Sequence, residues 1–201
     1  MTTILMMDIE TLGKSPDAVV WQTALYAVDS SDPETILDQP HFQYVPIQPQ
    51  LDLFPARKID ASTMLFWMRQ AAENPVVADE IEACDSSDFE ELPAVLRHFL
   101  RAFDRYTLNG AAEYELWTRG NFDVPIMESL LRQCGLVAPW TVGMGFRSIR
   151  DLRTLEAITG LSYKDVPPPI GYIKHRADWD AIFQLGHYSA MMRLIGTGQT
   201  I

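Results

Sequence analysis

Residues 4–11, Ile-Leu-Met-Met-Asp-Ile-Glu-Thr, decide the fold of this chain. The four leading apolar residues predict a strand that is buried on both faces, and it ends in the carboxylates of Asp8 and Glu10. Because successive strand side chains point to opposite faces, these two carboxylates emerge on the same side. Two like charges held so close repel and raise each other's pKa. A hard divalent cation such as Mg²⁺ or Mn²⁺, which prefers carboxylate oxygen, would remove that repulsion. The alternative is a strand that simply ends in an acidic turn.

Composition indicates a compact globular protein. The chain has 201 residues, of which 47% are hydrophobic and 21% are charged, and we expect one domain over 1–201. Cys84 and Cys134 form no pattern, so neither a disulfide framework nor a zinc site is indicated. The first residues lack a basic region before a short apolar run, and no apolar stretch reaches the length of a membrane span. We therefore expect a cytoplasmic protein without a membrane partner.

The charge distribution is uneven. A net charge of −11 argues against a protein that coats nucleic acid without regard to sequence, because such proteins are normally basic. Residues 147–176, however, hold more basic than acidic side chains, namely Arg147, Arg150, Arg153, Lys164, Lys174 and Arg176 among the basic ones. This segment could form a basic rim for phosphate, or it could be ordinary surface charge.

Hydrophobic patterning predicts an α/β domain with a mixed sheet, since strands come first and then alternate with helices. We expect strands over 4–9, 19–28, 42–45 and 113–118, helices over 62–72, 92–106, 124–134 and 177–195, and an irregular loop at the three prolines 167–169. Asp60 or Ser62 would cap the first of these helices.

Three further polar residues fit a metal site. Asp123 lies at a strand-to-helix junction, where α/β domains place ligand groups, although a helix N-cap is the alternative role. His175 and Asp180 are five residues apart and would not share one helix face. They can meet if His175 lies on the loop before the last helix and Asp180 projects from its first turns.

Taken together, these residues resemble, in order and context, the DEDDh branch of the 3′–5′ exonucleases. The three matching motifs are Asp8-Ile-Glu10-Thr11, Asn121-Phe122-Asp123, and His175-Arg-Ala-Asp-Trp-Asp180-Ala. The resemblance runs from residue 4 to about residue 190. The stretches that begin at Ala61 and Arg150 are most similar to the small bacterial and phage exoribonucleases related to RNase T. The spacing of five in the third motif selects Asp180 over Asp178.

The resemblance implies an RNase H-like fold, with a mixed five-stranded sheet flanked by helices, and a two-metal hydrolysis of the 3′-terminal phosphodiester. The metal ligands would be Asp8, Glu10, Asp123 and Asp180, holding two Mg²⁺ or Mn²⁺ ions. His175, with a pKa near neutrality, would be the general base that takes the proton from the attacking water.

By the same resemblance, Glu10 also acts in catalysis by touching the terminal ribose, and the backbone around Thr11 and Leu12 cradles the last nucleotide. Asn121 belongs to the second motif and is a further candidate substrate contact. Phe122 and Trp67 are candidates to stack on bases, with core packing as the alternative for both.

The expected substrate is the 3′ end of single-stranded nucleic acid. RNA is favoured by the similarity to RNase T, with DNA as the alternative, because metal hydrolysis is indifferent to the sugar and only contacts to the 2′-OH discriminate. Relatives of this kind are commonly homodimers, so we expect a homodimer.

Two other functions compete with this hypothesis. An aspartyl-phosphate phosphatase would use Asp8 as a covalent nucleophile, but it leaves Asp123, His175 and Asp180 unexplained. A nucleic-acid-binding module that has lost catalysis would keep the binding surface alone, and a metal-dependent activity assay separates it from an enzyme.

Overall fold

The computed structural model describes residues 2–84, 91–107, 113–142 and 145–197, and a mixed sheet organises them. The strands are β1 (Thr2–Thr11), β2 (Val20–Asp29), β3 (Asp32–Ile36), β4 (His41–Tyr44), β5 (Glu113–Thr118) and β6 (Ile149–Asp151). Their order is β3-β2-β1-β5-β6, and β4 also pairs with β2. β1 lies at the centre, antiparallel to β2 and parallel to β5. The predicted mixed sheet is therefore confirmed.

The sheet has six strands among the described residues, rather than the five expected. β4 pairs with residues 22–25 of β2, whereas β3 pairs farther along, at Val28 and Asp29, so the two strands follow one another along one edge. The pattern at β3 is polar, exposed and contains Pro33, and β6 is three residues long. Neither strand carries the alternation by which strands are predicted.

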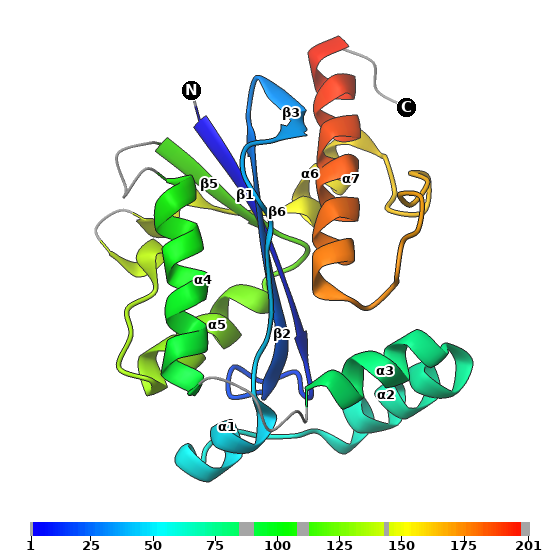
Figure 1. Cartoon of the computed structure of the whole chain (residues 1–201). Helices are drawn as coiled ribbons and strands as arrows, with labels where there is room; N and C mark the ends of the chain where they lie inside the picture. Colours follow the sequence, from blue (N-terminus) through cyan, green and yellow to red (C-terminus); the bar gives the residue numbers. More distant parts are fainter. Residues whose placement is uncertain (1, 85–90, 108–112, 143–144, 198–201) are drawn as a thin grey trace.

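Helices cover both faces of the sheet (Figure 1). α4 (Leu92–Tyr106) and α5 (Asp123–Gln133) lie on one face, and α6 (Leu152–Thr159) and α7 (Ala177–Thr197) lie on the other. The remaining helices are α1 (Ile47–Leu53), α2 (Ala61–Glu73), α3 (Pro75–Ala83) and the short 3₁₀ turns η1 (Pro139–Thr141) and η2 (Gly145–Ser148). The four predicted helices agree with α2, α4, α5 and α7 to within two residues at each end. No helix in the described part of the chain has both the length and the apolar character to cross a membrane.

The alternation along β1 divides the core. Leu5 and Met7 pack with α4 and α5, whereas Ile4 and Met6 pack with α6 and α7, and all four are at most 1% exposed. Full burial of each such side chain stabilises the fold by about 1.5–3 kcal/mol. Asp8 and Glu10 continue the register of Ile4 and Met6, so their carboxylates emerge on the α7 side of the sheet.

The α2–α3 hairpin projects beyond the carboxyl end of β1 and forms a third, smaller core (Figure 1). Its centre is the edge-to-face pair of Trp21 on β2 and Trp67 on α2, whose ring centroids are 4.8 Å apart. Asp60 occupies the cap position of α2, as one of the two alternatives predicted, but its Oδ2 accepts a hydrogen bond from the Lys14 backbone (2.8 Å) and not from the helix. The hairpin is thereby fastened to the loop that follows β1.

Candidate active site

A cavity of about 460 Å³ opens at the carboxyl end of β1, and all five predicted motif residues line it. β1 supplies Asp8 and Glu10, the first turn of α5 supplies Asp123, the loop before α7 supplies His175, and the first turn of α7 supplies Asp180. One ligand atom each of Glu10, His175 and Asp180 lie within 4.8 Å of one another. The fold thus brings together residues that are up to 172 positions apart in the chain (180 − 8).

Asp123 has a place inside its helix rather than before it. It is the first residue of α5, and the N-cap position belongs to Phe122, which makes no side-chain capping bond. The turn before it needs Gly120, whose φ is +99° and where a Cβ would lie 3.2 Å from the guanidinium of Arg153. Asp123 is 6% exposed and faces the cavity, so the alternative role as a helix cap is wrong.

His175 and Asp180 meet in the way that their spacing predicted. The backbone N–H of His175 donates to Oδ2 of Asp180 (3.3 Å), and His175 lies on the loop before α7. Asp178 instead forms an ion pair with Arg176 (3.0 Å) and does not line the cavity. The geometry therefore agrees with the choice of Asp180 over Asp178.

The carboxylates are crowded together at one cavity and largely buried, and this raises their pKa values. Burial, followed by the charges of Asp180, Asp123 and Glu10, raises the pKa of Asp8 well above its ordinary value. Burial and the charges of Asp180 and Asp123 do the same to the pKa of Glu10. Burial raises the pKa of Asp123 to about 8 and that of Asp180 to about 6. A cluster of this kind requires either protons or cations, and its oxygen donors are those that hard divalent cations prefer.

The imidazole of His175 is neutral at pH 7. Burial, and secondarily the charge of Lys174, lowers the pKa of His175 to about 4, which corrects the expected value near neutrality. Its Nε2 is buried without a hydrogen-bond partner. In the tautomer that carries the proton on Nδ1, this nitrogen has a lone pair that no group of the protein uses.

Two polar contacts that the sequence analysis did not predict hold the carboxylates in place. Gln184 on α7 donates through Nε2 to Oδ1 of Asp8 (2.6 Å), and the hydroxyl of Tyr172 donates to Oδ1 of Asp180. Gln184 follows Asp180 by four residues, which is one helical turn on the same face, so helical spacing could have indicated it. Tyr172 lies on a loop, where no periodicity points to it.

A second cavity of about 290 Å³ adjoins the first and shares Glu10 and Phe122 with it. Thr11, Phe66 and Trp67 also line it. Phe66 is 39% exposed and was not predicted, whereas Trp67 is 3% exposed. The adjoining cavity has the aromatic wall on which a base could stack.

Three of the predicted substrate contacts have polar atoms that form hydrogen bonds within the protein, namely Thr11, Leu12 and Trp67. Trp67 Nε1 donates to the carbonyl oxygen of Thr11 (2.8 Å), in agreement with the packing alternative for this residue. Leu12 is 7% exposed, and both its N–H and its carbonyl are bonded within the protein. Asn121 is exposed, and neither Leu12 nor Asn121 lines the two cavities. Contacts of Leu12 and Asn121 with a substrate remain predictions that the geometry of the cavities does not support.

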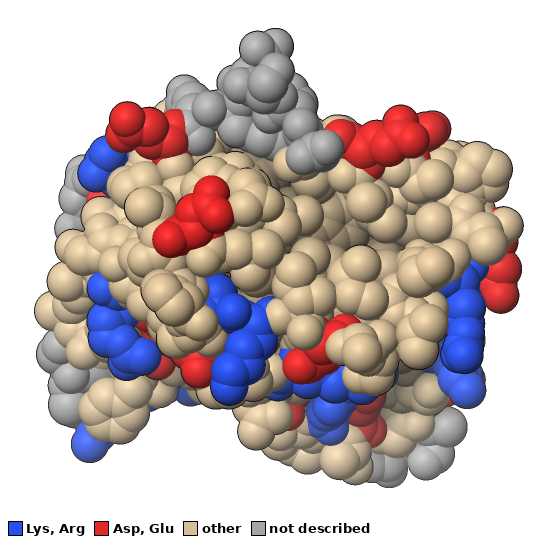
Figure 2. All heavy atoms as spheres, turned by 90° about the horizontal axis from the view of Figure 1, so that it is seen from below, with Lys and Arg blue, Asp and Glu red and all other residues tan. Residues whose placement is uncertain are grey.

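Basic side chains stand at the rim of the site. Arg119, Arg153 and Lys174 line the larger of the two adjoining cavities, and Arg119 is held by Glu156 (3.0 Å). Figure 2 shows the molecule from the side to which β1 runs, with most basic side chains and some acidic ones in a band across the lower half of the view, and other acidic side chains apart from it. Of the basic segment 147–176, only part reaches this rim, so the prediction of a basic rim holds for Arg153 and Lys174 alone.

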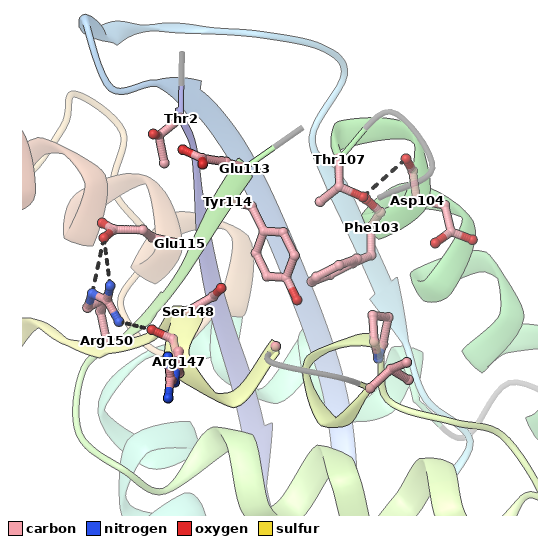
Figure 3. Close-up of a pocket in the computed structure, with 13 residues that line it drawn as sticks. Thr2, Phe103, Asp104, Thr107, Glu113, Tyr114, Glu115, Arg147, Ser148 and Arg150 are labelled. Carbon is pink, nitrogen blue, oxygen red and sulfur yellow. Dashed lines mark hydrogen bonds and ion pairs between the residues drawn. The ribbon is translucent and has the colours of Figure 1, made fainter. Parts of the chain in front are cut away.

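The largest cavity described, about 710 Å³, is at the other end of the sheet (Figure 3). The rings of Phe103 on α4 and Tyr114 on β5 pack edge to face in its wall, with centroids 5.1 Å apart, and Arg150 pairs there with Glu115 (3.0 Å). None of the five motif residues lines it. Cavity size therefore does not locate the site, whereas the convergence of carboxylates does.

Solved structures of exonuclease I have a fold similar to that of this chain. The product-bound structure of exonuclease I matches with 16% identity and a TM-score of 0.56, over 98% of this chain and 43% of that chain. Exonuclease I of E. coli in complex with a dA16 oligonucleotide matches with 15% identity and a TM-score of 0.57 (98% and 41%), and its zinc-bound form with single-stranded DNA with 16% and 0.53 (98% and 41%). The chain thus spans about two fifths of the length of these proteins, and at this identity the likeness concerns the fold.

The likeness confirms the RNase H-like fold that the sequence resemblance implied. A search of curated protein sequences gives no significant match. A model of the family described as the 3′–5′ exoribonuclease Rv2179c-like domain matches residues 3–192, which include all five motif residues. The chain therefore belongs to the family of 3′–5′ exoribonuclease Rv2179c-like domains.

Proposed function

We propose that this chain, as one domain, is a metal-dependent exonuclease that removes nucleotides from the 3′ end of single-stranded nucleic acid, with RNA preferred over DNA. The observation that carries the proposal is the single cavity in which Asp8, Glu10, Asp123, Asp180 and His175 meet. The description of the family supports RNA. Two of the described exonuclease I structures contain a DNA oligonucleotide or single-stranded DNA, which keeps DNA as the alternative.

The carboxylates fit a pair of divalent ions. Four acidic groups with raised pKa values face one cavity, and Asp8 is oriented by the hydrogen bond from Gln184. When bound, two Mg²⁺ or Mn²⁺ ions would supply an activated water and stabilise the leaving 3′ oxygen. Asp8, Glu10, Asp123 and Asp180 would hold them.

The chain's own residues would supply the remaining chemistry. Nε2 of His175, neutral and without a partner, would accept the proton of the attacking water. The chain is strongly acidic as a whole, and the positive charges of Arg119, Arg153 and Lys174 at the cavity would attract the phosphate groups of the substrate. These positive charges lie at the rim, where salt screens them, so salt should weaken substrate binding more than it weakens metal binding by the buried carboxylates.

The adjoining cavity would receive the terminal nucleotide. Glu10 belongs to both cavities and would contact the terminal ribose, while Phe122 stands between them. We expect Phe66 and Phe122 to form the aromatic contacts, because Trp67 presents little surface. Base stacking on such a ring contributes about 1–3 kcal/mol.

A gel assay tests the proposal. Single-stranded RNA and DNA of one sequence, labelled at the 5′ end, are incubated with the full chain in Mn²⁺, Mg²⁺ or EDTA. We expect a ladder that shortens from the 3′ end, faster on RNA, and that disappears in EDTA. Asp8→Ala should abolish cutting, and His175→Ala should slow it about 10²–10⁴-fold.

The matched control is Asp104→Asn. Asp104 is an exposed acid that lines the large cavity at the other end of the sheet, so this variant should cut like the unmodified chain. Loss of activity in Asp104→Asn, together with full activity in Asp8→Ala, would contradict the proposal, because the chemistry would then take place in the large cavity at the other end of the sheet. Binding of the oligonucleotide without cutting under any metal would support the silent binding module instead.

We further propose that the protein is a homodimer, as the resemblance implied. Light scattering coupled to size-exclusion chromatography should give twice the chain mass of 22.8 kDa, and a single chain mass across micromolar concentrations would contradict this.

A further inference from the structure

His175 is held in a backbone conformation that needs support. Its φ is +64°, and it is the only residue other than glycine with a positive φ in the described part of the chain. A left-handed conformation at a residue with a side chain persists only where its surroundings enforce it. The residues that enforce it therefore matter for the geometry of the active site.

The α2–α3 hairpin provides one side of that support. The rings of Phe66 and Trp67 on α2 meet the imidazole of His175 edge to face, with centroid distances of 5.1 and 5.7 Å. Trp67 is itself fixed by the hydrogen bond from its Nε1 to Thr11 and by its contact with Trp21. The imidazole thus lies against a rigid aromatic wall.

The other side of the support acts on the two residues that follow. The N–H of Ala177 donates to Oε1 of the fully buried Gln22 on β2 (3.0 Å). Arg176 lies over the ring of Phe42, 4.7 Å from its centroid, and its NH1 is 3.4 Å from Oε1 of Glu80. These two residues, at the junction of the loop and α7, are therefore tied to β2, β4 and α3.

Glu80 on α3 joins these ties into one junction. Its Oε2 accepts hydrogen bonds from Nε2 of Gln22 (2.9 Å) and from the hydroxyl of Tyr44 (2.6 Å), while its Oε1 faces Arg176. Glu80 is 8% exposed and lines neither of the two cavities of the site. A buried carboxylate with this many donors is a fixed point, because the loss of any one contact leaves a buried charge or donor unpaired.

We propose that Glu80 is a positioning residue that holds His175 in its reactive orientation through Arg176 and Ala177. The expected changes in kcat rest on the exonuclease function proposed above, whereas the orientation of His175 can be measured without it. Glu80 touches no reacting atom and no metal ligand, so its removal should affect the general-base step and leave metal binding intact.

The test is Glu80→Gln, compared with the matched control Glu115→Gln. Glu115 also accepts from an arginine, Arg150, and from an aromatic N–H, that of Trp117, but it lies at the opposite end of the sheet. We expect Glu80→Gln to lower kcat about 10–100-fold, the usual effect of losing a residue that orients an active-site group, while KM and the Mn²⁺ affinity measured by calorimetry stay unchanged. Glu115→Gln should change none of these values.

A double-mutant comparison tests whether Glu80 acts through His175. In a His175→Ala background, Glu80→Gln should cause no further loss of kcat. An equal loss in both backgrounds would overturn the proposal, because Glu80 would then support the fold in general. Arg176→Gln replaces Glu80→Gln if the latter does not fold, and it should show the same dependence on His175.

A spectroscopic readout keeps the proposal separate from the proposed function. In protein labelled with ¹³C-histidine, the His175 ring resonance, assigned by its loss in His175→Gln, should be displaced by the rings of Phe66 and Trp67. Glu80→Gln should move it toward the position of an exposed histidine, and an unmoved resonance would overturn the proposal. A chain that cuts no nucleic acid would contradict the exonuclease function, and this resonance would still decide the role of Glu80.

Discussion

Replacing Asp123 with asparagine tests the electrostatic state of the cavity directly. Asp123 is 6% exposed, and burial raises its pKa to about 8, against only a partial opposing effect of Arg153. In the unfolded chain the carboxyl group returns to its ordinary value of 3.8. At pH 7 the folded, metal-free protein must keep this group protonated although the unfolded chain does not, so it loses stability.

The magnitude follows from the difference between pH 7 and the ordinary pKa. A difference of about 3 units at 1.36 kcal/mol per unit is roughly 4 kcal/mol of unfolding free energy. Because the pKa of Asp123 is higher in the folded state than in the unfolded chain, the folded protein has its full stability below about pH 4 and loses roughly this free energy of unfolding as the pH rises toward 8. Asparagine has nearly the same shape and does not ionise. Asp123→Asn should therefore be more stable than the unmodified chain in EDTA at pH 7, with the difference largely gone near pH 4.

Urea unfolding followed by circular dichroism at pH 4.5, 6 and 8, in EDTA and in Mn²⁺, measures this effect. In Mn²⁺ the order should reverse, because the unmodified chain gains the free energy of metal binding and the variant lacks one ligand. Asp52→Asn, a change at an exposed acid on α1, should leave stability unchanged at every pH. A difference that does not depend on pH, or a variant that is less stable in EDTA at pH 8, would refute the reasoning.

Three further predictions concern the neighbours of the site. Gln184→Ala removes the hydrogen bond to Asp8 and should weaken Mn²⁺ binding about 10–100-fold, measured by isothermal titration calorimetry; an unchanged affinity would show that Asp8 needs no orienting partner. Phe122→Ala should weaken binding of a single-stranded oligonucleotide by about 1–3 kcal/mol in fluorescence anisotropy, whereas equal affinities would mean that the ring only packs. Trp67→Phe loses the bond from Nε1 to Thr11 and should lower the free energy of unfolding by about 1–3 kcal/mol in a urea titration, and unaltered stability would contradict its structural role.

Sequence periodicity predicts most of the fold because it reports burial directly. The helices α2, α4, α5 and α7 and the strands β1, β2, β4 and β5 were each predicted close to their observed bounds, and the apolar face is clearest on α4. Among the elements that were missed, β3 with its exposed polar residues and the three-residue β6 bury too little surface to leave such a pattern. The helices α1, α3 and α6 were also missed, and each has nine residues or fewer, too few turns for a helical period to stand out.

The five motif residues were also predictable, because residue type and spacing along the chain are enough to identify them. The register of β1 places Asp8 and Glu10 on one face whatever packs against them. Gln184 could have been inferred from the helical turn that it shares with Asp180, whereas Phe66 and Tyr172 are distinguished only by their position in space.

The sequence by itself determined the central strand, the mixed α/β architecture and the identity of the residues that converge, because side-chain period and motif order are local properties. Only the tertiary structure decided the protonation of the site and the support of His175. A pKa depends on how far a group is removed from water and on charges brought from other elements, and this is why His175 has a pKa of about 4 and not one near neutrality. The junction at Glu80 likewise joins β2, β4, α3 and the loop before α7, which no spacing along the chain connects.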